Sequence, residues 1–374
     1  MGVKPVKQHF VPKFLLDHFL SPGTDQLFAF DKETGNEFTV NKRDAASQRY
    51  FYDYIDDDGG LASAEAYFHQ WEEPTADLLR RILRQGCISY LNEADSTLLA
   101  VFLCVQQMRT PALRRQLKEA HRLAVARFRE KNPQATDQQQ IDGLGVEPDE
   151  NELVKQSLEA LKSRSAKAVQ YFLKGKVWML HEAIGSRPFI IGDNPIGFQL
   201  EHGPAMESGQ GTLSIETTGI EMYMPLSSRY TISVVCTSHF AQMKRQRVKL
   251  LNIVKIGKRC KGYTPPREIA HLAPMMKGIE DEAVADLKDI EAMIHSIRTG
   301  ASLPSFEDHV VRKNSIQVYS AERFLYSSTS DFSLAKQMVA CDSHLKGGLV
   351  VGESGLLPPT FPGAHGQAKA SGDK

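Results

Sequence analysis

The pattern of apolar and polar positions divides the chain into alternating β-rich and helical stretches. The segment QLFAFDKETGNEFTV (residues 26–40) has two short apolar-aromatic runs around a DKETG turn, which predicts a β-hairpin. From Ala62 to about Ile184 the apolar residues recur at helical spacing, so we expect several helices there, with Trp178 in the last of them. Residues 187–236 again have the pattern of strands, and the apolar stripe that begins at Val284 and Leu287 predicts a later helix. A last helix is expected over about residues 308–326.

This order of elements favours an α+β fold that is mainly helical. We expect a small antiparallel sheet built from the N-terminal hairpin and the strands of residues 187–236. One large domain would cover residues 1–353, β-rich at 8–60, helical at 61–186, β at 187–240 and helical at 265–330. The acidic, Gln-rich segment 135–152 predicts an exposed loop, and the Gly-, Pro- and Ala-rich residues 354–374 predict a flexible tail.

Composition excludes several classes of protein. Hydrophobic residues make up 41% of the 374 and charged residues 24%, as in an ordinary globular protein. Lys plus Arg equals Asp plus Glu at 45 each, so net charge does not favour a nucleic-acid or membrane partner. No apolar run approaches the roughly 18 residues of a membrane span, and the N-terminus lacks a hydrophobic signal core, so we expect a cytoplasmic protein with no membrane partner. The five cysteines form no CxxC pair, which disfavours a disulfide framework and a structural zinc site.

The first candidate for chemistry is QHFVPKFLLDHF (residues 8–19). Pro12 suits the first turn of a short helix, and Gln8 and His9 lie just ahead of that helix, near backbone amides that help to orient an anion. The alternative is that His9 only hydrogen-bonds a loop carbonyl.

The second candidate is FLCVQQMRTPALRR (residues 102–115). Gln106 and Arg109 interrupt an apolar helical stripe, and Pro111 predicts that the helix kinks or ends there. A buried guanidinium needs a carboxylate, a carbonyl or a bound phosphate as its partner. The alternative is a structural pair of Arg109 with Asp193 or with a helix C-terminus.

The third and fourth candidates are FIIGDNP (residues 189–195) and RKNSIQVYSAERFLYSS (residues 312–328). Asp193 follows a strand, where it is suited to hold Mg²⁺, to act as a base, or to cap the turn. Its neighbour Asn194 precedes a proline, which favours extended backbone. Asn314 and Gln317 share one helical face, and their amides suit a substrate or neighbouring backbone. Because three of the four segments combine a carboxamide with a charge, we expect a shared pocket.

The chain resembles the bacterial family of domain of unknown function 4238 in a set of segments that occur in the same order. These segments are QHFVPKFLLDHF, QQMRTP, FIIGDNP followed by MYMPLS, and NSIQVYSAERFLYS. The resemblance covers about residues 8–328. It implies no activity and assigns no roles. It implies that ten residues are motif positions of the family: Gln8, His9, Gln106, Arg109, Thr110, Asp193, Asn194, Pro195, Asn314 and Gln317.

Two functional hypotheses follow from these residues. The first is a metal-dependent phosphoester hydrolase or nuclease, acting in bacterial stress or phage defence. In it His9 is the general acid or base, Arg109 stabilises phosphate charge, and Asp193 holds Mg²⁺. The expected substrate-binding residues are Gln8, Gln106, Asn194, Asn314 and Gln317. The second hypothesis is a non-catalytic sensor or adaptor that binds a nucleotide, a peptide or a partner protein in the same pocket.

A nucleic-acid partner is suggested by one further feature. Residues 244–261 carry eight Lys or Arg residues and no acid, which is typical of a surface that binds polyanions. The alternative is a solvated positive face.

Overall fold

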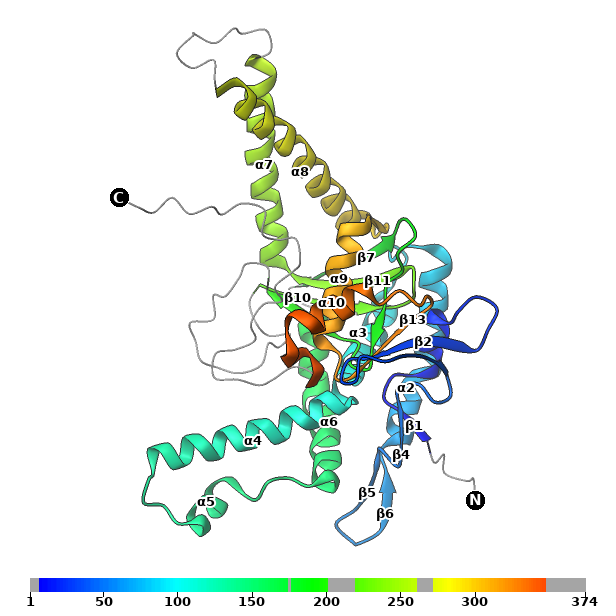
Figure 1. The fold of residues 1–374 in the computed structure, drawn as a ribbon, viewed down its shortest axis with the longest axis vertical. Helices are drawn as coiled ribbons and strands as arrows, with labels where there is room; N and C mark the ends of the chain where they lie inside the picture. The colour runs from blue at the N-terminus through cyan, green and yellow to red at the C-terminus, as the bar shows by residue number, and fades with distance from the viewer. Residues whose placement is uncertain (1–6, 174–175, 201–218, 261–271, 348–374) are drawn as a thin grey trace.

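The computed structural model describes residues 7–173, 176–200, 219–260 and 272–347 (Figure 1). Two short 3-10 helices, η1 (Asp17–Phe19) and η3 (Ser343–Gly347), accompany the α-helices. The α-helices are α1 (Lys13–Leu16), α2 (Glu65–Gln85), α3 (Glu93–Met108), α4 (Pro111–Lys131), α5 (Asp137–Leu144), α6 (Glu150–Leu173), α7 (Thr237–Cys260), α8 (Ala273–Thr299), α9 (Glu307–Ser320) and α10 (Ser333–Cys341). The strands are β1 (Lys7–His9), β2 (Gln26–Asp31), β3 (Glu37–Asn41), β4 (Ser47–Arg49), β5 (Asp53–Ile55), β6 (Leu61–Ser63), β7 (Lys176–Ala183), β8 (Ile191–Gly192), β9 (Gly197–Leu200), β10 (Ile220–Pro225), β11 (Tyr230–Cys236), β12 (Leu303–Ser305) and β13 (Phe324–Ser327).

The fold is α+β and mainly helical, as the sequence predicts. The N-terminal hairpin forms as β2 and β3, and it joins a four-stranded sheet of order β3-β2-β13-β8. Strands β9, β10 and β11 instead belong to a second sheet of order β12-β7-β11-β10-β9. The expected sheet is therefore divided into two, and the β12–β7 pair in the second is parallel.

Three local expectations are corrected by the structure. Residues 176–183, expected to be helical, form the inner strand β7, with Trp178 in it; a short apolar run such as VWML fits a buried strand as well as a helix. The expected loop 135–152 contains α5, which begins with a capping box between Thr136 and Gln139. The last predicted helix, α9, ends at Ser320, and the chain continues as β13. The expected break at Pro111 is confirmed, because α3 ends at Met108 and α4 begins at Pro111.

The five-stranded sheet has one apolar face and one polar face, because side chains alternate along each strand. Leu180, Met222 and Ile232 point into the main core, where they share a cluster with residues of α2, α3 and α6. Their neighbours in the same strands, His181, Tyr223 and Ser233, are polar and also buried. Helix α9 packs against this sheet at β9 and β12.

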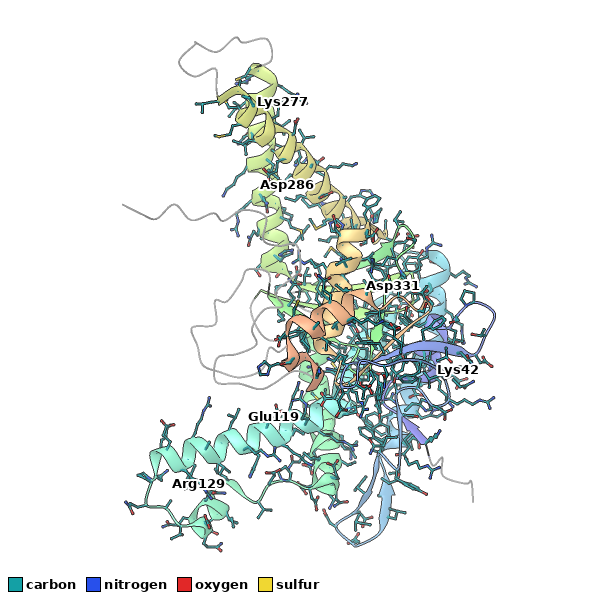
Figure 2. All side chains as sticks on the ribbon, in the orientation of Figure 1. Lys42, Glu119, Arg129, Lys277, Asp286 and Asp331 are labelled. Atoms are coloured by element: carbon teal, nitrogen blue, oxygen red, sulfur yellow. The ribbon has the colours of Figure 1, made fainter. Side chains whose placement is uncertain are left out.

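Two helical projections extend from the body (Figure 1). Helices α7 and α8 form an antiparallel pair whose seam contains Leu250 and Val254 against Ala283 and Ile290. Val284, part of the predicted stripe, is instead exposed. Helix α4, which leads out to α5, forms the second projection. Arg129 lies toward the outer end of α4 (Figure 2). The predicted tail, residues 354–374, lies outside the described residues.

Candidate functional site

Gln8 and Gln106 fix the backbone of the N-terminal segment. The backbone N–H of Tyr52 donates to Gln8 Oε1 at 2.5 Å, and Gln8 Nε2 donates to Asp53 at 2.8 Å. Gln106 Nε2 donates to the carbonyl of Phe10 at 2.8 Å. Both amides, expected to bind substrate, therefore bond neighbouring protein groups.

Arg109 is buried, and each of its three guanidinium nitrogens has a protein partner. It donates to Glu72 at 2.8 Å, to the carbonyl of His9 at 2.6 Å, and to the hydroxyl of Tyr52 at 3.1 Å. The carboxylate partner of Arg109 is thus Glu72 of α2, and neither Asp193 nor a helix C-terminus fills this role. Arg109 ties the end of α3 to β1 and α2.

The imidazole of His9 lies at the edge of this group. Its Nε2 is 3.3 Å from the carbonyl oxygen of Lys42, which is the loop-carbonyl contact of the alternative interpretation. Burial lowers the pKa of His9 below its ordinary value, and the nearby Lys13 lowers it further. The ring is therefore neutral at neutral pH.

Asp193 holds the segment that follows α9. Its carboxylate accepts backbone N–H bonds from Glu322 at 2.6 Å, Arg323 at 2.9 Å and Phe324 at 2.8 Å. Burial raises the pKa of Asp193 to about 6, against the lowering by these N–H groups and by Lys32. These bonds turn the chain from α9 into β13, so Asp193 caps a turn.

Lys32 completes this clamp from the other side. Its ammonium group donates to the carbonyls of Val318 at 2.8 Å and Ala321 at 2.5 Å, in the last turn of α9. Burial lowers the pKa of Lys32 to about 8, and the Asp193 carboxylate opposes that lowering. A cation thus holds the carbonyls at the end of α9, and an anion holds the N–H groups that follow.

The remaining predicted amides fasten FIIGDNPIG to α9. Gln317 accepts the N–H of Gly192 at 3.0 Å and donates to the carbonyl of Pro195 at 2.8 Å. Asn314 makes the same kind of pair with the backbone of Ile190 and Pro188, at 3.1 and 2.9 Å. Asn194 Nδ2 donates to the carbonyl of Ser320 at 3.0 Å. These three side chains bond backbone, which is the alternative interpretation of their pattern.

A close approach of backbones makes this arrangement possible. At Gly197 a methyl group would collide with Ile316 of α9, so glycine is required there. The predicted residues thus form two separate clusters in the structure. One surrounds Arg109 and contains Gln8, His9 and Gln106, and the other surrounds Asp193 and contains Asn194, Asn314 and Gln317. No hydrogen bond or ion pair joins Asp193 to His9 or Arg109 in the described part of the chain.

An open pocket of about 330 Å³ adjoins both clusters. Its lining residues come from β4, the residues after it, and the starts of α4 and α6: Gln48, Phe51, Pro111, Arg114, Arg115, Lys118 and Glu150. Gln48 pairs with Gln8 in the β1–β4 register. Arg115 Nε donates at 2.5 Å to Glu322, whose own N–H is held by Asp193. The motif residues therefore position the walls of this basic pocket, which we call the α4 pocket.

Arg114 is the least neutralised cation in the α4 pocket. Its side chain is 11% exposed, it stacks on Phe51 and it donates to the carbonyl of Phe51. The only carboxylate recorded as an ion pair with it in the described ranges is Glu150, at 3.8 Å, and that side chain is 70% exposed. Burial lowers the pKa of Arg114 to about 10, which leaves the guanidinium charged at neutral pH.

The start of α4 adds further attraction for an anion. The first N–H groups of a helix have no acceptor within the helix, and they form the positive end of its dipole. Thr110 occupies the N-cap position but its side chain makes no capping bond, and among the described residues its buried hydroxyl has no hydrogen-bond partner. The α4 pocket thus combines a buried cation with a helix N-terminus, and the unbonded hydroxyl of Thr110 lies just before Pro111 in its wall.

The sequence analysis did not identify Arg114, Arg115 and Lys118 as site residues. A signal was present, because ALRRQLK follows directly after Pro111 and places three cations near the start of a helix. For metal binding, a search of the described residues finds no group of three or more His, Cys, Asp or Glu side chains suited to an ion.

Comparison with known proteins gives one match. The model of the family described as protein of unknown function (DUF4238) matches residues 7–331. No curated protein and no solved structure matches the chain. Within the described ranges, none of the helices combines the length and the apolar character that crossing a membrane requires.

Proposed function

The chain belongs to the DUF4238 family of proteins of unknown function, and we propose that it is a non-catalytic sensor or adaptor that binds a nucleotide through its phosphates in the α4 pocket. The observation that carries this proposal is Arg114, a largely buried guanidinium whose ion pair with Glu150 is long, at 3.8 Å, and involves an exposed carboxylate. An arginine in this situation gains most from a bound phosphate, which accepts two parallel N–H bonds.

The size and composition of the pocket fit this ligand. Pockets for small molecules usually measure about 300–1,000 Å³, and the α4 pocket falls in this range at about 330 Å³. Lys118 now donates to Glu150 at 2.7 Å. Because Glu150 is largely exposed, a phosphate can replace it as the partner of both Lys118 and Arg114 at little cost.

A phosphoester hydrolase or nuclease is the second candidate, and the neutral imidazole of His9 favours it. A neutral ring near Arg109 has the protonation state that a general base requires. In this proposal Asp193 would help to hold Mg²⁺, which would supply Lewis-acid chemistry to a phosphate. The bonds that Asp193 makes to three backbone N–H groups count against it as the principal metal ligand.

A nucleic-acid partner is a further proposal, supported by α7. The described part of the basic stretch, residues 244–260, lies on this projecting helix, with Lys249 and Lys255 exposed. Helix α8 beside it carries acidic residues, and Glu291 neutralises Arg247. The surface available to a polyanion is therefore the side of α7 that faces away from α8.

Thermal unfolding in the presence of ligands separates the first two candidates. A nucleotide sensor is stabilised by ATP without any metal, because a ligand that binds only the folded state raises the melting temperature. A metal-dependent enzyme is stabilised by ATP only when Mg²⁺ or Mn²⁺ is added. No shift with nucleotides, with or without metal, would contradict both proposals.

A further inference from the structure

A second group of polar side chains lies on the face of the five-stranded sheet opposite the apolar core. Tyr223 of β10 is directly paired with Ser233 of β11, and His181 of β7 is paired with Thr231, two residues before Ser233 in β11. From α9, Lys313 approaches the same face, with its ammonium nitrogen 5.6 Å from the centroid of the Tyr223 ring. Buried polar groups require partners, so an incompletely bonded group of this kind indicates a missing one.

His181 has one nitrogen satisfied and one open. Its Nε2 is 2.7 Å from the hydroxyl of Ser233, and the residue is only 4% exposed. The other ring nitrogen, Nδ1, is buried and has no hydrogen-bond partner among the described residues. Burial lowers the pKa of His181 well below its ordinary value, so the ring is neutral. When Ser233 donates to Nε2, Nδ1 carries the proton and requires an acceptor.

Lys313 is a cation without a bonded anion. In the described part of the chain its ammonium group makes no hydrogen bond or ion pair, and it lies over the Tyr223 ring. The acid whose charge acts on Lys313 is Glu221, which pairs with His239 at 3.3 Å and accepts a bond from the Tyr223 hydroxyl. Burial lowers the pKa of Lys313 to about 8, and the positive charge of Arg312 acts in the same direction.

We propose that Lys313 and His181 form a second binding site, separate from the α4 pocket, for a small anion with a carboxylate or phosphate group. The anion accepts a bond from the Lys313 ammonium and another from His181 Nδ1. The Tyr223 ring forms one wall. Such an anion supplies the partner that, among the described residues, no bonded carboxylate provides for Lys313 of α9 or for His181 of β7.

Chemical labelling of the full-length protein tests this site. Acetic anhydride is uncharged and reacts with neutral amines, and mass spectrometry of peptides reports the rate at each lysine. The rate at Lys313 is measured in chloride, in inorganic phosphate and in acetate at constant ionic strength. Lys277, exposed on α8, is the internal reference (Figure 2).

The expected result is that phosphate or acetate slows the labelling of Lys313 at least fivefold while the rate at Lys277 is unchanged. Protection by phosphate alone identifies a phosphate ligand, and protection by acetate alone identifies a carboxylate. In the variant His181→Asn, which keeps Lys313 available for labelling, the protection should fall by at least half. Equal labelling of Lys313 in all three salts would overturn the proposal, and full protection in His181→Asn would remove His181 from it.

Discussion

Arg114 places its guanidinium carbon 3.5 Å from the centroid of the Phe51 ring. This stacking and the bond to the Phe51 carbonyl fix the charge of Arg114 at the wall of the α4 pocket. Tyr52, which follows Phe51 in the sequence, accepts a hydrogen bond from Arg109. Arg115, which follows Arg114 on α4, bonds Glu322 beside Asp193. The family motifs and the α4 pocket are thus parts of one hydrogen-bonded framework.

Asp193 should be essential for stability. Asp193→Ala leaves three buried N–H groups without an acceptor, so we expect a loss of about 3–5 kcal/mol in the free energy of unfolding at pH 7. Urea unfolding measures this loss. Asp286→Ala, on the exposed surface of α8, is the matched control and should change stability by less than about 0.5 kcal/mol. An Asp193→Ala protein as stable as the wild type would show that the clamp at α9 is unimportant.

The pKa of Asp193 makes a specific prediction about pH. Its folded-state pKa of about 6 lies above the ordinary value of 3.8, so the folded protein binds this proton more tightly than the unfolded chain. The resulting stability is complete below about pH 4 and is lost as the pH rises through about 6, by about 3 kcal/mol in total. Asp193→Asn cannot titrate, so the difference in unfolding free energy between wild type and variant should change by most of this amount, about 2.4 kcal/mol, between pH 4 and pH 7. A constant difference would contradict the raised pKa.

Arg109 should behave as a structural residue. Arg109→Met leaves Glu72 and the carbonyl of His9 without their buried partner, and we expect a loss of about 3–5 kcal/mol. The control is Arg122→Met on α4, where the ion pair with Glu147 is exposed. The catalytic hypothesis instead predicts that Arg109→Met folds normally and loses only phosphoester hydrolysis, so chemical unfolding distinguishes the two.

The sequence was sufficient for the class of fold. Periodicity identified α2, α3 and α8, and the rule for proline placed the break between α3 and α4 at Pro111. Periodicity did not identify β7, because the apolar run VWML is too short to distinguish a buried strand from a helix. The division into two sheets depends on β13 pairing with β2, a contact between residues almost 300 positions apart, which local patterns do not reveal.

The sequence also indicated which side chains are polar inside the protein, but it did not reveal their partners. Gln317 and Asn314 were expected to bind substrate, and each instead bonds a backbone N–H and a backbone carbonyl in residues 188–195. One side-chain amide both accepts and donates, so it satisfies a backbone N–H and a backbone carbonyl of an extended segment that packs against its helix. The alternation of polar and apolar residues along the strands made the face with His181, Tyr223 and Ser233 detectable from the sequence. Only the position of α9 shows that this face is buried.

Helix α7 should bind polyanions in a manner that depends on salt. If α7 makes about four phosphate contacts with double-stranded DNA, affinity should fall on the order of 100-fold between about 50 and 200 mM salt. Gel-shift titration of Lys249→Glu/Lys255→Glu should show weaker binding than the wild type. The variant Lys277→Glu/Lys288→Glu makes the same change of charge on α8 and should bind nearly as the wild type does. Equal weakening by both variants would mean that net charge, and not the surface of α7, is responsible.

The central claim is that Arg114 binds phosphate in the α4 pocket, and two variants test it in opposite directions. Arg114→Gln removes the bidentate charged partner of a phosphate, which corresponds to a loss of about 10- to 100-fold in affinity. Glu150→Gln removes the carboxylate that competes for Arg114 and Lys118, so it should tighten binding several-fold. Such a gain cannot come from damage to the fold. Arg122→Gln, further along the same helix, is the control for loss of one positive charge.

The most direct measurement is the dissociation constant of ATP, by isothermal titration calorimetry without metal, for the wild type and these three variants. The account predicts weaker binding for Arg114→Gln, tighter binding for Glu150→Gln and no change for Arg122→Gln. ATP binding that is the same in the wild type, Arg114→Gln and Glu150→Gln would contradict it.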